Sequence, residues 1–387
     1  MELELTEDQQ ELRDSVRTVL EAKCPLSFVR SVYEDGAGAD GLWAQMVELY
    51  WPAVALPESI GGLGLTFVEL AIVAEELGRA TAPGPFLATA TQFAPLVLET
   101  ASVEQRQTLL TPVAEIGSTG TVAFAERGRY ELAAVETTAR RSGDGWVIDG
   151  SKSTVFDGGS ADEIVVIARA EGTVGDDGLG VFVVRGSDVK AAPRVTIDPT
   201  ITLSDLSLQD VSVAGDRVLV EPGDPRAPEA IRRAWQASVI ALAASTVGTC
   251  RRIFETTLEY AKVREQYERQ IGSFQALKHR FADAYLSVER AASLSYFASL
   301  TVAEDDERRA QAASLTKAAA GDCQRLLVGE GLQLHGGVGF TWEYDLHFLL
   351  KRAKAGDALL GNAVFHRSEL ARMLGLTAQA SPVGVSA

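Results

Sequence analysis

The chain has 387 residues, 46% of them hydrophobic and 23% charged, which is enough for two or three domains with a large buried core. Its 36 Lys and Arg are outnumbered by 53 Asp and Glu, so the formal net charge is −17. This acidity argues against sequence-independent binding of nucleic acid, which needs a basic surface to neutralise phosphates, but it leaves room for a local basic pocket.

Residues 1–120 are predicted to form an N-terminal helical domain. Thr6 is a candidate N-cap, because acidic residues and then apolar residues at helical spacing follow it. A turn-rich break over residues 57–64 precedes a second strong helix, expected from about 66 to 80. Pro83, Gly84 and Pro85 end that helix.

Residues 121–228 are predicted to form a middle β-domain. Short runs of β-branched and apolar residues alternate there with turns that contain Gly and Asp. The runs cover residues 133–139, 145–150, 163–168 and 180–184. This pattern predicts a small antiparallel barrel or sandwich, and Pro222 and Pro225 mark its end.

Residues 229–387 are predicted to form a C-terminal helical bundle and a tail, so the fold class is α+β and mostly α. Long helices are expected over about 229–263, 273–303 and 306–332. The first is rich in small residues, which allow close helix contacts in a bundle or at a subunit interface. Ser381, Pro382 and Gly384 are typical of a frayed tail.

The cysteines and the start of the chain predict a soluble, cytoplasmic protein without a metal site. Cys24, Cys250 and Cys323 are far apart and match neither a disulfide framework nor a metal-binding motif, so we expect buried apolar packing. The first residues carry acids where a signal peptide has a basic segment and an apolar core. No run approaches the ~20 apolar residues of a membrane span.

Four stretches give the chain a specific resemblance to a known family. Each stretch resembles a pattern of acyl-CoA dehydrogenases. Residues 57–64 resemble PExxGGxG, and residues 146–152 resemble WxLNGxK. Residues 260–283 resemble YAxxRxxFGxxIxxFQxxxxxLAD, and residues 333–344 resemble QxxGGxGxxxEY. Departures from these patterns include Asp149 for Asn, Tyr267 for Phe, Glu268 for Gly and Phe281 for Leu. The matches follow the family order across essentially the whole chain.

This resemblance implies an N-terminal helical domain, a β-domain, a four-helix bundle and an FAD shared between subunits. In such dimers of dimers, one subunit's β-domain holds the isoalloxazine ring and the neighbour's bundle holds the ADP part. The matching ADP-binding positions here are Arg264, Phe274, Gln275, Gln333, Gly336 and Gly337. The guanidinium of Arg264 can pair with a pyrophosphate, and the two glycines allow the backbone to approach it closely. The amides of the two glutamines donate and accept hydrogen bonds, and the Phe274 ring can pack on an apolar or ring surface.

The isoalloxazine half of the family pattern is weakened in this chain. The loop TEPxAGSD aligns with a stretch in which Ala125 replaces the Thr and Arg127 the Pro, and no Ala-Gly-Ser-Asp run follows. The turn WITN aligns with a stretch that begins at Thr154, in the aromatic position, and has Phe156 in the hydroxyl position. Both changes weaken the expected flavin seat.

The usual catalytic base is also missing. Dehydrogenation needs a carboxylate that removes the α-proton while a hydride passes to the flavin. The position of that Glu in most relatives aligns with Leu360, and its position in a second group of relatives aligns with Ser238. Asp357 and Glu343 are poor substitutes, since Asp357 is three residues out of register and Glu343 already has a family counterpart with another role.

The chain therefore keeps what it would contribute to a neighbour's FAD and lacks what it would need for its own. This pattern predicts the non-catalytic subunit of an α2β2 acyl-CoA dehydrogenase, similar to those of bacterial steroid side-chain degradation. Its expected partners are a catalytic subunit, an acyl-CoA with a steroid side-chain or fatty acyl group, and an electron-transfer flavoprotein. The alternatives are an active homotetramer with an atypical base and a flavin-free scaffold; the DNA-associated members of the fold are disfavoured by the acidic charge.

Overall fold

The computed structural model describes residues 4–376 and confirms the predicted order of helices, a β-sheet and helices. Thr6 caps the first helix through a capping box with Gln9, as predicted, and Thr66 caps α4 in the same way with Glu69. The N-terminal helices are α1 Glu7–Lys23, α2 Leu26–Asp35, α3 Asp40–Glu48, α4 Phe67–Arg79, α5 Phe86–Ala88, α6 Ala94–Thr100 and α7 Val103–Ile116.

A twisted eight-stranded sheet follows in the described part of the chain. Its strands are β1 Gly120–Ala123, β2 Thr138–Ser142, β3 Gly145–Phe156, β4 Glu163–Ala170, β5 Leu179–Arg185, β6 Lys190–Pro193, β7 Leu203–Val213 and β8 Val218–Val220. The strand order is β6-β7-β3-β2-β4-β5-β8, with β1 also paired to β4. Because β1 and β2 both run parallel to β4, the expectation of a purely antiparallel domain needs correction: the sheet is mixed.

The strand predicted over 133–139 is wrong for most of its length. Leu132–Ala134 forms a single 3-10 turn, and β2 begins only after it. The buried Glu126 carboxylate accepts the backbone N–H groups of Glu136, at 2.7 Å, and Thr137, at 3.0 Å. These amides therefore bond to a side chain, which takes the segment out of the strand ladder despite its β-type composition.

Five helices complete the described chain, namely α8 Ala227–Val263, α9 Gln275–Ala303, α10 Arg309–His335, α11 Leu346–Ala358 and α12 Ala363–Met373. The first four pack together, and α12 lies against α10. A small hairpin, β9 Glu265–Gln266 with β10 Arg269–Gln270, joins α8 to α9. None of the helices described is long and apolar enough to cross a membrane, and the tail predicted around Ser381, Pro382 and Gly384 lies outside the described residues.

Helix α8 is the central element, and it meets α4 backbone to backbone. A Cβ atom on Gly248 of α8 would lie 1.9 Å from the Glu75 carbonyl oxygen, and one on Gly78 of α4 would lie 1.9 Å from the Ser245 carbonyl oxygen. Only glycine fits at these two crossings. The small residues of α8 are thus used inside this chain, where most of them are buried.

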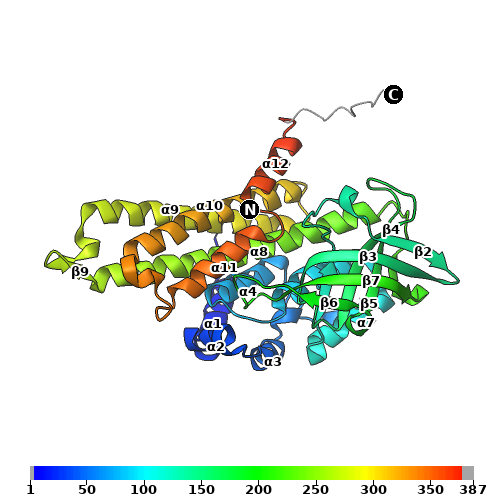
Figure 1. The fold of residues 1–387 in the computed structure, drawn as a ribbon, viewed down its shortest axis with the longest axis horizontal. Coiled ribbons are helices and arrows are strands. Elements are labelled where there is room, and N and C mark those ends of the chain that lie inside the picture. The colour runs from blue at the N-terminus through cyan, green and yellow to red at the C-terminus, as the bar shows by residue number, and fades with distance from the viewer. Residues whose placement is uncertain (1–3, 377–387) are drawn as a thin grey trace.

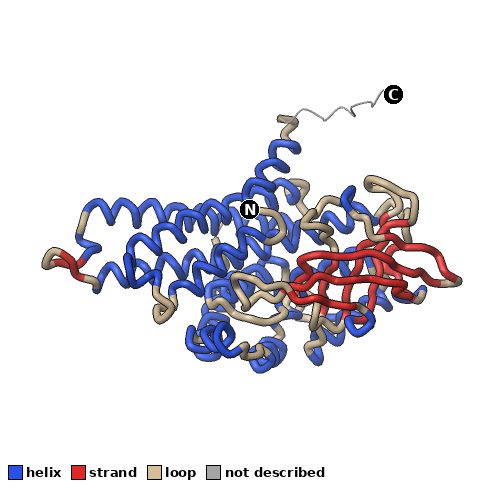
Figure 2. Tube along the Cα trace, viewed as in Figure 1, coloured by secondary structure: helices blue, strands red, loops and turns tan. Residues whose placement is uncertain are grey.

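The sheet and the β9–β10 hairpin lie at opposite ends of the molecule, separated by the length of the long helices (Figure 1; Figure 2). The three parts of the chain are tied together near their meeting point by the buried Asp198, in the connection from β6 to β7. Its carboxylate accepts a hydrogen bond from Tyr33 of α2 at 2.9 Å and lies 3.6 Å from Arg352 of α11.

Candidate functional site

The six positions expected to contact the ADP part of a dinucleotide all lie at the hairpin end of the bundle. Arg264 follows the last turn of α8, Phe274 and Gln275 start α9, and the remaining three, Gln333, Gly336 and Gly337, lie at or just after the end of α10. A small apolar cluster that contains Ala261, Ile271, Phe281 and Leu334 holds these helix ends together. Phe274 is half-buried, and the other five residues are exposed.

At this end of the bundle, a positively charged side chain and the backbone of two glycines are exposed to solvent. Lys262 is paired with Glu259 at 2.6 Å, whereas Arg264 has no such ion pair among the described residues. Gly336 has φ 63°, a value that strains other residues, and nothing lies within 4 Å of a Cβ built on Gly336 or Gly337. These features fit a pyrophosphate, which needs a fixed cation and close backbone approach.

A second group of expected positions meets at the opposite end, where the sheet joins the helices. Ala125, Thr154 and Phe156 were matched to the family's flavin seat, and Leu360 and Ser238 to its base. All five residues line the same cavity. The volume of this cavity is about 30 Å³, which is space for roughly one water molecule. An isoalloxazine ring does not fit there.

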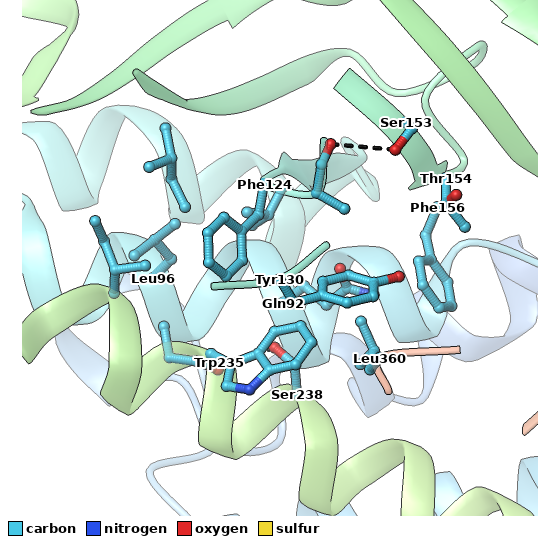
Figure 3. Close-up of a pocket in the computed structure, with 15 residues that line it drawn as sticks. Gln92, Leu96, Phe124, Tyr130, Ser153, Thr154, Phe156, Trp235, Ser238 and Leu360 are labelled. Atoms are coloured by element: carbon cyan, nitrogen blue, oxygen red, sulfur yellow. Dashed lines mark hydrogen bonds between the residues drawn. The ribbon is translucent and has the colours of Figure 1, made fainter. Parts of the chain in front are cut away.

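Aromatic side chains fill this site (Figure 3). The Tyr130 ring lies between Phe124 and Phe156, next to Trp235 and Leu360; these five side chains are called the aromatic plug. The centroids of the Tyr130 and Trp235 rings are 4.6 Å apart with an interplanar angle of 32°, and the Phe124 ring meets Trp235 edge-on at 5.7 Å. Burial raises the pKa of Tyr130 to about 12, so its hydroxyl stays neutral at physiological pH.

Sequence reasoning missed Tyr130 and Trp235 as members of this site. Tyr130 belongs to the loop in which the family has the small residues of its Ala-Gly-Ser-Asp run. A bulky ring in place of small residues was the available signal in that loop. For Trp235 the signal was weaker, since an aromatic residue on a long helix usually indicates core packing.

The loop that carries Leu360 is held in place by side-chain groups that hydrogen-bond to its main-chain carbonyl oxygens. Leu360 has φ 54°, and its carbonyl oxygen accepts from His366 Nε2 at 2.9 Å. The buried Lys317 donates to the carbonyl oxygens of Gly361, at 2.8 Å, and Asp357, at 2.9 Å. Burial lowers the pKa of Lys317 to about 7. The leucine side chain is therefore fixed in the cavity, where it is only 3% exposed.

No group at this cavity has the chemistry of a general base. Its lining residues include no Asp, Glu, His, Cys or Lys. The Ser238 hydroxyl contacts two main-chain carbonyl oxygens, at 2.9 and 3.0 Å, and no base is present to activate it. Asp357 accepts from the Gln324 side chain at 3.2 Å, Glu343 is exposed, and neither lines the cavity.

The aromatic plug separates this cavity from a larger one. Tyr130 and Trp235 also line a second cavity of about 590 Å³, whose other walls come largely from α8, α10 and α12. That volume is within the usual range of small-molecule sites. The charged side chains at this cavity include the ion pairs of Arg232 with Asp176 and of Arg372 with Glu369.

Comparison with known proteins agrees with this architecture. Models of the acyl-CoA dehydrogenase N-terminal, middle and C-terminal domains match residues 6–116, 122–212 and 230–375. The chain is 31% identical to acyl-CoA dehydrogenase IpdE2 of Mycobacterium tuberculosis over 356 residues, 92% of this chain and 93% of that protein.

Two solved structures are similar over nearly the whole chain. A chain of the ChsE4-ChsE5 complex from Mycobacterium tuberculosis superposes with a TM-score of 0.86 and 26% identity, over 98% of this chain and 100% of the other. A chain of the Tcur3481-Tcur3483 steroid ACAD superposes with a TM-score of 0.84 and 28% identity, over 95% of this chain and 98% of the other.

Proposed function

This chain belongs to the acyl-CoA dehydrogenase family, FAD-dependent oxidoreductases that act on CH–CH bonds, and we propose that it completes the FAD site of a catalytic partner subunit. One observation carries this proposal. The positions matched to ADP contacts are exposed at the hairpin end of the bundle, while the chain's own flavin and base positions, at the other end, are filled by the aromatic plug.

The chemistry of the exposed residues suits this role. In the assembly, Arg264 pairs with the pyrophosphate of the partner's FAD, and Gly336 and Gly337 let the backbone approach it. The side-chain amides of Gln275 and Gln333 hydrogen-bond to its polar groups. The β9–β10 hairpin and the sheet lie at opposite ends of the molecule, so the positions matched to ADP contacts and those matched to the flavin seat belong to different regions of this chain (Figure 1).

The absence of a base supports a non-catalytic role. An acyl-CoA thioester loses its α-proton at neutral pH only to a positioned base. Leu360 has no ionisable group, and the Ser238 hydroxyl is already bonded within its helix and to a neighbouring one. The proton is therefore removed by a residue of the partner subunit.

The proposed assembly is an α2β2 heterotetramer that acts on an acyl-CoA and passes electrons to an electron-transfer flavoprotein. The similarity to a chain of the ChsE4-ChsE5 complex supports a heteromeric arrangement, and the similarity to a chain described as a steroid ACAD supports a steroid side-chain substrate.

Flavin content tests the proposal. The full chain is expressed alone and together with an acyl-CoA dehydrogenase encoded beside its gene, and FAD is measured by absorbance after extraction. We expect the chain alone to be flavin-free and the complex to hold about one FAD per two chains, because only the partner offers a complete flavin seat.

Two other results would support the alternatives. Stoichiometric FAD and turnover by the chain alone would contradict the proposal and indicate an active homotetramer with an atypical base. A stable but colourless complex would indicate a flavin-free scaffold.

A further inference from the structure

We propose that the aromatic plug occupies the volume of a flavin ring in this chain, so that the junction of sheet and helices is complete without a cofactor. This inference deepens the proposed function and rests on it for the location of the ring. It assigns the exclusion of flavin to specific side chains, principally Tyr130 and Phe156, rather than to the mere loss of hydrogen-bond donors.

The location follows from the lining of one cavity. Five positions that the family pattern assigns to the flavin seat or to the base come from four separate segments of the chain, and all five line the cavity of about 30 Å³. They are Ala125, Thr154, Phe156, Ser238 and Leu360. The plug rings stand among these positions (Figure 3).

The plug is a well-packed arrangement. Phe124, Phe156 and Leu360 are at most 8% exposed. The Tyr130 ring lies next to Leu360, so it packs against the loop opposite it (Figure 3). Tilted and edge-on contacts join Tyr130, Trp235 and Phe124. These ring contacts hold Tyr130 between the small cavity and the larger one, both of which it lines.

The polar side chains around the plug are largely engaged within this chain. The Ser238 hydroxyl donates to two main-chain carbonyl oxygens, and the Thr154 hydroxyl accepts from Arg194. The Ser153 hydroxyl accepts from the backbone N–H of Gly128. The rings of the plug therefore occupy a site whose hydroxyl groups already have partners.

Opening the plug tests this inference directly. In the full chain, the paired substitutions Tyr130→Gly and Phe156→Thr remove one ring from each side of the cavity. Riboflavin is the probe, because it carries the isoalloxazine ring without the ADP part and so does not depend on the hairpin end. We expect riboflavin to bind the opened variant at least about tenfold more tightly than the wild type and to raise its Tm by several degrees, since a ligand stabilises the state that binds it.

A matched control separates cavity filling from general loss of stability. Phe281→Ala removes a buried ring from the apolar cluster at the hairpin end, so it should lower Tm without any response to riboflavin. Quenching of riboflavin fluorescence gives the affinities, and far-UV circular dichroism checks that each variant is folded. If the double variant does not fold, Phe156→Thr alone is tested by the same criteria.

Two results would overturn the inference. One is a folded opened variant that binds riboflavin no better than the wild type; the other is wild-type chain that already binds riboflavin at this cavity. Failure here is distinguishable from failure of the proposed function, because the latter is decided by the FAD content of the wild-type complex.

Discussion

At the scale of single residues, Leu360 has an unusual backbone conformation for its residue type. Its left-handed backbone, with φ 54°, costs on the order of 1–3 kcal/mol for a residue other than glycine. The hydrogen bonds from Lys317 and His366 to the surrounding carbonyl groups hold this strained loop in place. The loop geometry thus presents the side chain to the cavity, but that side chain is a leucine, so the position contributes packing and no proton transfer.

A single-residue prediction concerns Arg264. Arg264→Ala should lower FAD retention by the complex about tenfold or more, because a charge-assisted contact with a phosphate is worth roughly 1.5–3 kcal/mol. Retention is measured as FAD bound after dialysis. Lys262→Ala is the matched control, since Lys262 is exposed on the same end of α8 but is paired with Glu259. Equal retention in wild type and Arg264→Ala would remove Arg264 from the site.

At the scale of elements, the contact between α4 and α8 is the tightest helix crossing in this region. The backbone carbonyl oxygens of Glu75 and Ser245 occupy the space in which a side chain on Gly248 or Gly78 would lie. Both helices contribute to the apolar core that contains Phe156 and Leu360 of the plug, and α8 also carries Trp235 and Ser238. The separation of these two helices therefore affects the shape of the site.

Gly248→Ala is expected to lower the free energy of unfolding by about 3 kcal/mol, because the added methyl group forces the two backbones apart. Gly329→Ala is the control: it lies in α10, where nothing is within 4 Å of a new Cβ, and it should stabilise the chain by roughly 0.5–1 kcal/mol through helix propensity. Chemical unfolding followed by circular dichroism measures both. An equal effect of the two substitutions would argue against the backbone contact.

At the scale of the whole molecule, Asp198 links the N-terminal helices, the sheet and the C-terminal helices at one buried point. It accepts from Tyr33 and from the Thr200 hydroxyl, and it lies 3.6 Å from Arg352. Arg352 is itself only 4% exposed. Removal of the carboxylate would leave a buried guanidinium without its counter-charge.

We therefore expect Asp198→Ala to lower the free energy of unfolding by about 3–5 kcal/mol. The near-UV and far-UV signals should shift together, because all three parts of the chain meet at this residue. Asp322→Ala, which breaks the partly exposed pair with Arg367, should cost about 1 kcal/mol or less. A loss confined to one of the two optical signals would show that Asp198 does not couple the three parts.

The order of the three regions, the cap at Thr6 and the family motifs can all be predicted from the sequence, because they depend on residue identity and on local spacing. The sequence also shows that Leu360 and Ser238, the two positions matched to the family's base, carry no carboxylate. The same reasoning failed at residues 133–139, where composition favoured a strand but the Glu126 carboxylate takes two of the backbone amides.

The meeting of Tyr130 and Trp235 at the junction of sheet and helices becomes visible only in the folded chain. Tyr130 and Trp235 are about a hundred residues apart in the sequence, and nothing in the local pattern of either indicates that their rings meet. The parallel pairing of β1 and β2 with β4 and the close crossing of α4 and α8 are likewise contacts between distant segments. Local periodicity shows which face of an element is apolar, but the partner of that face is set by packing of the whole chain.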